Sequence, residues 1–291
     1  MNFSDPAWRR APLRTSLRVA TSLARRSLPG MSRVRVRYDG DRSLISADLL
    51  TPLGLQLYRY GHHDPDIDLI ARLLSPGDIF VDGGANVGLF TLVAARRVGA
   101  TGRVIAFEPG RTVRTRLLEN IALNRFTQVD VMPFALSSAP GEASFTEFEI
   151  AGAGMSHLAP VAGESGRVET VALTTLDAMV NASDRKRLVL VKLDLEGAEH
   201  AALLGAATLL DESHPDLLIE IEASHLARMG SSPQAVAMLL RQYGYKFFRL
   251  APDGDALRLS PVDDIMAPAA APNVFATVDP ERARRRGVLV R

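Results

Sequence analysis

The sequence predicts an α/β protein built on a doubly wound, Rossmann-like sheet. Three observations predict this fold: short apolar runs of the kind buried in parallel sheets, helical stretches that alternate with them, and a glycine-rich turn directly after the first run. The 291 residues are enough for one large α/β domain with an appendage. We divide the chain into a basic arm (1–32), a cap (33–74), the main domain (75–280) and a basic tail (281–291) that we expect to be solvated.

Composition excludes several classes of protein. The hydrophobic share of 47% and the net charge of +1 are ordinary for a globular protein. No stretch reaches the ~20 uncharged apolar residues that a membrane-spanning helix needs. The absence of cysteine excludes disulfides, thiolate zinc sites and a cysteine nucleophile, and it fits a reducing cytoplasm. We therefore expect a cytoplasmic protein.

The first 37 residues are strongly basic, with nine arginines and a single acid, Asp5. Leu13, Leu17, Leu23 and Leu28 recur among them at roughly helical spacing. One interpretation is a basic amphipathic helix in peripheral contact with an anionic membrane or an acidic partner. A transit peptide and a loosely ordered, solvated arm are the other two.

The cap begins with alternating apolar residues after Arg33, which predict a hairpin with its turn at Asp39-Gly40 and a second strand at 43–50. A second short run covers 53–60, and a helix over 67–74 closes the cap.

Strands and helices alternate through the main domain. The predicted strands of the sheet are 79–81, 103–108, 128–133, 143–148, 168–173, 188–191, 217–219, 246–250, 256–259 and 273–277. Helices are predicted over 87–98, 112–124, 198–211 and 233–243. The segment 151–167, rich in Gly, Ala and Ser, is either a lid over the substrate or a plain surface loop.

A glycine-rich turn, Asp82 to Gly88, follows the first strand. Ligands of open parallel sheets bind beyond the carboxyl ends of the strands, and Gly84 and Gly88 allow a close approach to the backbone. The spacing differs from the Gly-x-Gly-x-x-Gly turn of nicotinamide sites. Asp82 would also meet a pyrophosphate unfavourably, whereas it suits the amino and hydroxyl groups of an uncharged nucleoside that carries a methionine chain.

Glu108 ends the next strand, where an acid can accept hydrogen bonds from both ribose hydroxyls. The alternative is a solvated acid at a strand end. Asn86 could reach the methionine carboxylate or cap the helix that follows it.

Four segments together resemble the FkbM-type methyltransferases: Val81 to Gly88, Phe107-Glu108-Pro109, Ala135-Leu136-Ser137 and Val191 to Glu199. The similarity runs from about Tyr60 to Leu250. It implies a class I methyltransferase fold, S-adenosylmethionine as the cofactor, and methyl transfer, commonly to hydroxyl groups of sugars, polyketides or other specialised metabolites. Asp64 stands where a glutamate is expected, and Gly83 where many relatives have a bulkier residue.

The motif residues that the resemblance places at the cofactor are Asp82, Gly84, Asn86, Gly88, Glu108 and Ser137. The catalytic candidates are Lys192, Asp194 and Glu196, because strand alternation puts the first two on one face and the third just past the tip. Asp194 or Glu196 would be the base, and Lys192 only if burial lowers its pKa. The structural alternative is a partly buried ion pair of Lys192 with Glu220 or Asp194.

Two histidines, His157 and His225, are further candidates for the base, or else ordinary surface or capping residues. The adjacent His62-His63 point to opposite faces of an extended chain, so we assign no metal.

The leading hypothesis is an O-methyltransferase acting on a small hydroxylated acceptor such as a sugar, a glycolipid or a specialised metabolite. The alternatives are a noncatalytic module that binds through its basic arm and a nicotinamide-dependent oxidoreductase. We expect no nucleic acid partner, because the sequence lacks a basic face interleaved with aromatic residues.

Overall fold

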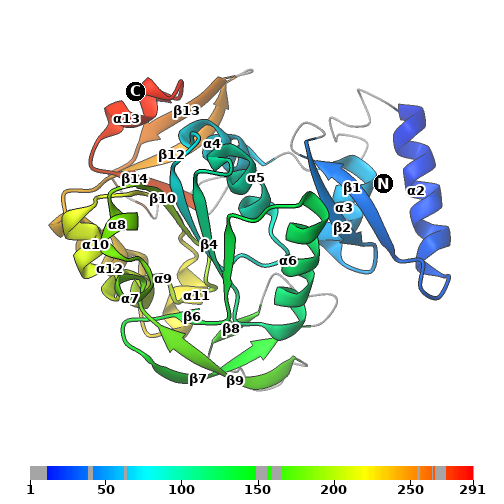
Figure 1. Ribbon diagram of the computed structural model, residues 1–291, viewed down its shortest axis with the longest axis horizontal. Helices are drawn as coiled ribbons and strands as arrows, with labels where there is room; N and C mark the ends of the chain where they lie inside the picture. Colours follow the sequence, from blue (N-terminus) through cyan, green and yellow to red (C-terminus); the bar gives the residue numbers. More distant parts are fainter. Residues whose placement is uncertain are drawn as a thin grey trace.

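The computed structural model describes residues 12–38, 42–61, 64–148, 156–158, 166–253, 256–263, 265 and 273–290. Its centre is a sheet in the order β15-β13-β12-β14-β11-β10-β3-β4-β5 (Figure 1). The strands are β3 (Ile79–Gly83), β4 (Arg103–Phe107), β5 (Val129–Met132), β10 (Leu188–Leu193), β11 (Asp216–Glu220), β12 (Lys246–Asp253), β13 (Ala256–Pro261), β14 (Asn273–Thr277) and β15 (Leu289–Val290). The predicted doubly wound sheet is confirmed.

The strand order reverses at β3. The chain runs from β3 out to β4 and β5, then returns to form β10 on the other side of β3. Strands β5, β4, β3, β10 and β11 are mutually parallel, while β14 is antiparallel to β11 and β12. The carboxyl ends of β3, β4 and β10 therefore lie together at the point where such sheets bind ligands.

Helices cover both faces of this sheet (Figure 1). One face carries α4 (Pro65–Leu73), α5 (Leu89–Val98) and α6 (Arg111–Asn124), and the other carries α9 (Glu199–Leu204), α10 (Ala207–Glu212) and α12 (Pro233–Gln242). Strand β3 is buried between the two helix layers. Phe80 belongs to the apolar cluster that contains Leu69 of α4, whereas Val81 belongs to the cluster that contains Leu203 of α9. This double burial explains why the run is continuously apolar.

The cap contains the hairpin β1 (Arg33–Tyr38) and β2 (Ser43–Asp48), whose predicted turn lies outside the described residues. The short run 53–60 is a helix, α3 (Pro52–Tyr60), because Thr51 caps its first turn and Pro52 occupies the first position. The fully buried Asn120 of α6 ties the hairpin to the glycine-rich turn. It accepts from the Ser46 N–H and donates to the Val87 carbonyl, both at 2.8 Å.

Helix α4 belongs to the main body rather than to the cap, since Leu69, Ile70 and Leu73 are fully buried against the sheet. The arm forms a helix, α2 (Pro12–Arg26), that packs on α3 at the edge of the molecule (Figure 1). No described helix combines the length and the hydropathy that crossing a membrane requires.

A second, smaller sheet has the order β6-β9-β7-β8. Its strands are β6 (Ala135–Leu136), β7 (Gly141–Glu147), β8 (His157–Leu158) and β9 (Arg167–Thr174). The prediction that 143–148 and 168–173 join the main sheet is wrong. The two segments pair antiparallel with each other, and each contains exposed as well as buried residues, as expected of a sheet that is not covered on both faces.

Two further predictions differ from the structure. The helix predicted over 198–211 is divided into α9 and α10 at Gly205, where a Cβ would meet the Ser137 carbonyl oxygen at 2.2 Å. The tail forms α13 (Pro280–Arg285) and β15 instead of extending into solvent. Arg282 lies 3.3 Å from the buried carboxylate of Asp216, which draws the tail onto the sheet. The remaining helices are α7 (Leu176–Met179), α8 (Ala182–Arg185) and α11 (Ala223–Arg228).

Candidate active site

The turn after β3 has a left-handed backbone at three of its residues: Gly84 (φ 74°), Asn86 (φ 50°) and Gly88 (φ 98°). A Cβ on Gly84 would lie 1.9 Å from the Asp194 carbonyl oxygen, so only glycine lets the turn approach the tip of β10. The N–H groups of Gly84 and Ala85 donate to the Phe107 carbonyl at 3.1 and 2.9 Å. The turn is therefore fastened to both β4 and β10.

Asp82 lies beneath this turn and is fully buried. One carboxylate oxygen accepts from the Thr91 hydroxyl at 2.5 Å, and the other lies 3.7 Å from the Lys192 ammonium. Burial raises the pKa of Asp82 above its ordinary value, although Lys192 and Thr91 oppose the shift. Asp82 therefore lies under the turn and attracts the Lys192 ammonium. It does not line the cavity at the ends of the strands.

A cavity of about 220 Å³ opens at the carboxyl ends of β3, β4 and β10. Its walls include the turn residues Gly84 to Val87, Glu108 from β4, and Lys192, Asp194 and Glu196 from β10 and its tip. The second sheet contributes apolar atoms from Leu136, Phe145 and Leu158. An elongated ligand can therefore touch three of the predicted cofactor residues, Gly84, Asn86 and Glu108, as well as the predicted catalytic residues. Asp82, Gly88 and Ser137 are not part of the wall.

Glu108 has 6% of its surface exposed, and both of its oxygens accept backbone hydrogen bonds. The Asn86 N–H donates at 2.8 Å and the Gly110 N–H at 2.9 Å. Burial raises the pKa of Glu108 to about 7 despite these two bonds. The donors fix the carboxylate at the cavity wall, and each oxygen keeps a second lone pair for a hydroxyl group of a ligand.

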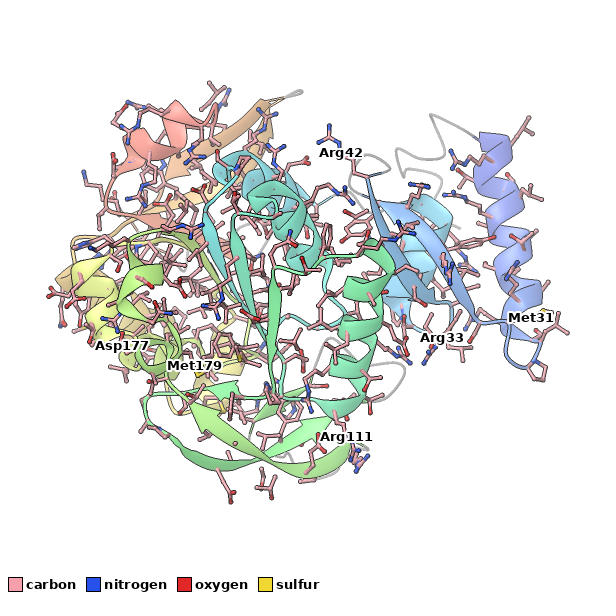
Figure 2. All side chains as sticks on the ribbon, viewed as in Figure 1. Met31, Arg33, Arg42, Arg111, Asp177 and Met179 are labelled. Atoms are coloured by element: carbon pink, nitrogen blue, oxygen red, sulfur yellow. The ribbon has the colours of Figure 1, made fainter. Side chains whose placement is uncertain are left out.

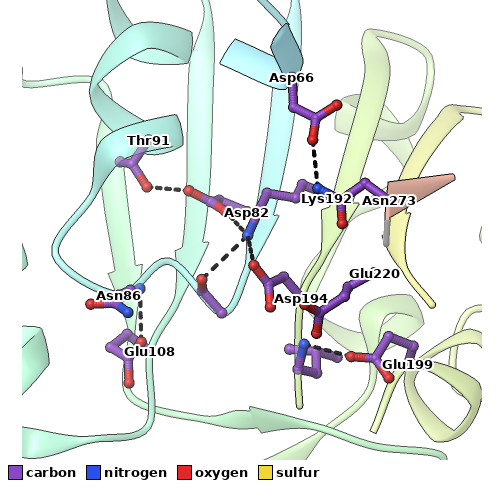
Figure 3. Close-up of polar contacts among 12 residues, drawn as sticks. Asp66, Asp82, Asn86, Thr91, Glu108, Lys192, Asp194, Glu199, Glu220 and Asn273 are labelled. Atoms are coloured by element: carbon purple, nitrogen blue, oxygen red, sulfur yellow. Dashed lines mark hydrogen bonds and ion pairs between the residues drawn. The ribbon is translucent and has the colours of Figure 1, made fainter. Parts of the chain in front are cut away.

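Lys192 and Asp194 form the ion pair that alternation predicted. The Lys192 ammonium lies 3.3 Å from the Asp194 carboxylate and 3.7 Å from that of Asp82 (Figure 3). It also lies 4.7 Å from the centre of the Phe90 ring. Among the described residues, Lys192 forms no ion pair with Glu220. Burial lowers the pKa of Lys192, but the attraction of Asp194 and Asp82 outweighs burial and leaves it raised. The condition under which Lys192 could act as the base, a lowered pKa, is therefore not met in this arrangement.

Glu196, Glu220 and His225 meet just past the tips of β10 and β11. The His225 Nδ1 atom lies 3.0 Å from the Glu196 carboxylate and 3.8 Å from that of Glu220. Burial, followed by the charge of Asp194, raises the pKa of Glu196 to about 7 and that of Glu220 to about 9. Burial lowers the pKa of His225. Their donor atoms lie within 4.8 Å of one another, a set that can share a proton or hold a divalent cation.

The remaining predicted positions are not part of the cavity wall. Ser137 is half-buried beside it, and its N–H donates to the Thr174 carbonyl at 2.9 Å. His157 is buried against Phe148 in the second sheet, with Nδ1 3.1 Å from the Leu158 carbonyl oxygen. Asp64 caps α4 by accepting from the Asp66 N–H. The pair His62-His63 and most of the proposed lid lie outside the described residues.

Sequence reasoning missed several residues that hold the site together. Asp66 is nearly buried beside the Lys192 cluster, accepts from the Asn273 amide at 2.5 Å, and has its pKa raised to about 6 by burial (Figure 3). Glu199 accepts from the Leu195 N–H at 2.6 Å and so shapes the turn that presents Glu196. The third acid of the Asp-x-Glu-Gly-x-Glu segment is the one signal that could have indicated Glu199.

Comparison with known proteins decides the family. The profile described as Methyltransferase FkbM domain matches residues 82–247, which span the turn, β4, β10 and the cavity. The chain belongs to the FkbM methyltransferase family. Its cofactor is accordingly S-adenosylmethionine, and the nicotinamide alternative is set aside.

Relatives of this methyltransferase differ in size. The AMB antimetabolite synthetase AmbE of Pseudomonas aeruginosa is 27% identical over 209 residues, which cover 60% of this chain and 10% of the synthetase. Methyltransferase sdnD of Sordaria araneosa is 30% identical over 199 residues, 58% of this chain and 74% of sdnD. The crystal structure of the FkbM methyltransferase of Methylobacillus flagellatus has 15% identity and a TM-score of 0.45, covering 93% of this chain and 60% of that one.

The residues around the cavity fit S-adenosylmethionine. Glu108 would present its fixed carboxylate to the ribose hydroxyls, and apolar side chains such as Leu136 and Phe134 would present a surface to the adenine ring. Asn86 adds a polar group on the wall, although its side-chain oxygen already accepts from the Val87 N–H at 2.7 Å. The acidic end at Asp194 and Glu196 suits a positively charged sulfonium.

Proposed function

We propose that this FkbM methyltransferase transfers a methyl group to a hydroxyl oxygen of a small, hydroxylated acceptor such as a sugar, a glycolipid or a specialised metabolite. The observation that carries the proposal is the position of the Asp194 carboxylate. It lines the same cavity as Glu108, and the ammonium of Lys192 holds it there at 3.3 Å. A carboxylate so placed can accept the hydrogen bond of an acceptor hydroxyl.

S-adenosylmethionine supplies an activated methyl group and a thioether leaving group. The chain then has two tasks, which are to align the acceptor oxygen and to remove its proton. Asp194 receives the hydroxyl proton as the new carbon–oxygen bond forms, so that the product is a neutral methyl ether. Lys192 remains protonated throughout and keeps the Asp194 carboxylate oriented toward the cavity.

Glu196 lies on the same wall, and its pKa of about 7 lets it exchange a proton near neutral pH. At neutral pH the negative charge at this end of the cavity comes from Asp194 and from the ionised fraction of Glu196, because Glu220, with its pKa raised to about 9, is protonated. An acceptor that carries hydroxyl donors but no carboxylate or phosphate next to the reacting oxygen meets this wall without charge repulsion.

The test is to incubate the pure protein with cofactor bearing a ¹³C-methyl group and an extract of its own cell, and to identify the labelled product by nuclear magnetic resonance. A methoxyl carbon in the product is the expected result. A product labelled on nitrogen or carbon would overturn the proposed hydroxyl acceptor. Binding of the cofactor without any labelled product would instead favour the noncatalytic alternative.

A further inference from the structure

Helix α2 packs on the protein through its polar side and leaves its apolar side exposed. The side that faces the protein is mainly polar, with Thr15, Val19 and Ser22 buried. The Arg59 Nε–H of α3 donates to the Ser22 hydroxyl at 2.8 Å, and the Thr21 hydroxyl lies 2.9 Å from that of Tyr58. The helix is therefore fixed to α3 by hydrogen bonds, so the direction in which its other side points is set by the fold.

The opposite side of α2 is apolar and faces solvent. The exposed fractions are 87% for Leu13, 65% for Leu17 and 52% for Leu23, and Leu28 and Met31 beyond the helix end are each 50% exposed. Figure 2 shows α2 at the outer edge of the molecule, with Met31 near its carboxyl end. We call these five side chains the leucine face. A contiguous apolar surface of this kind marks an interaction site.

The chain segment that carries the leucine face has only positive charges. Residues 6–38 contain no acid, and Arg14, Arg25 and Arg26 of α2 are exposed. With about 3.6 residues per turn, Arg14 and Arg25 fall on the same flank of the helix, beside Leu13 and Leu17. These guanidinium groups make no ion pair within the part of the chain that the structure describes.

We propose that the leucine face and its flanking arginines bind the surface of an anionic lipid membrane. An apolar face bordered by arginines is the arrangement of helices that lie in the membrane interface, where leucines enter the acyl boundary and guanidinium groups reach the lipid phosphates. An acidic protein would match the arginines alone. The exposed leucines are what favours lipid.

The position of α2 connects this surface with the cavity. Leu53, in the first turn of its partner α3, is part of the cavity wall. Membrane attachment through α2 would therefore hold the cap next to the lipid headgroups.

Vesicle sedimentation of the full chain tests the inference, using phosphatidylcholine vesicles with and without phosphatidylglycerol. We expect binding to the anionic vesicles that weakens as salt is added. The double variant Leu13→Ser/Leu17→Ser should bind at least about tenfold more weakly, because each leucine loses its transfer to the apolar phase. The double variant Arg14→Gln/Arg25→Gln should bind the anionic vesicles about tenfold more weakly than the wild type at low salt.

Matched controls remove similar groups elsewhere. Leu118 and Met238 are exposed by 51% and 64% on other helices, and Arg284 and Arg285 are exposed on α13. Replacing the first pair by serine, or the second pair by glutamine, should leave vesicle binding unchanged. Melting temperatures of all variants show whether each remains folded.

Three outcomes overturn the inference. One is equal sedimentation with neutral and anionic vesicles, and another is undiminished binding by the leucine variant. The third is a dimeric mass in light scattering that becomes monomeric in Leu13→Ser/Leu17→Ser, which would assign the leucine face to a second copy of the chain.

Discussion

The Lys192 ammonium lies between two carboxylates, 3.7 Å from that of Asp82 and 3.3 Å from that of Asp194. Asp82 belongs to the buried floor of the site and Asp194 to its wall, so one cation joins the cofactor turn to the acceptor end. Both strands present these groups at the same level, because Lys192 pairs with Asp82 in the register of β10 and β3.

Lys192→Met should therefore destabilise the protein strongly. The change leaves the fully buried Asp82 without its cation, a loss that typically costs about 3–5 kcal/mol. Urea unfolding measures it, with Lys186→Met on the exposed surface as the control. The double variant Lys192→Met/Asp82→Asn should recover part of the loss. A single variant as stable as the wild type would show that the pair contributes nothing.

Glu108→Gln should weaken binding of S-adenosylmethionine by about 1–3 kcal/mol, because the ribose hydroxyls lose a charged acceptor. The pH dependence follows from the raised pKa of about 7. The ionised carboxylate is the better acceptor of hydrogen bonds. The wild type should therefore bind S-adenosylmethionine more weakly as the pH falls from about one unit above that pKa to about one unit below it. Calorimetry should show a flatter pH profile for the variant, and identical affinity and pH profiles would remove Glu108 from the site.

Gly84→Ala tests the close approach of the turn to β10. The left-handed backbone costs about 1–2 kcal/mol for alanine, and the added Cβ would also meet the Asp194 carbonyl oxygen. We expect lower stability and weaker cofactor binding. Gly230→Ala is the matched control, since Gly230 has φ 72° but open space around its Cβ position. Equal effects of the two substitutions would show that the close approach is unimportant.

The parts of the fold that the sequence predicts are those with local causes. The apolar run at Ile79–Gly83 and its glycine turn are recognisable because burial on both faces and a left-handed backbone each restrict the residue types. Which sheet a strand joins is a long-range property. Strands β7 and β9 pair with each other, for example Gly141 with Leu173, and not with the main sheet. The sequence of either segment alone does not indicate this pairing.

The site shows the same division. Alternation predicts that Lys192 and Asp194 share a face, but it does not give the neighbours across the sheet. The sequence therefore suggests Glu220 as a partner of Lys192 and does not indicate Asp82, which the register of β10 and β3 places opposite it. Asp66 comes from α4 and reaches the cluster only through tertiary packing. The arm is a similar case, because the leucine spacing indicates a helix while its orientation depends on Arg59 and Tyr58 of α3.

The most direct test of the proposed function is the variant Asp194→Asn, with turnover, cofactor affinity and melting temperature measured on the same preparation. If Asp194 takes the hydroxyl proton, turnover should fall about 100-fold or more while affinity and melting temperature stay close to the wild type. If Asp194 serves only the ion pair with Lys192, the melting temperature should fall and turnover per folded molecule should not. Normal turnover in a folded variant would contradict the assignment of Asp194 as the base.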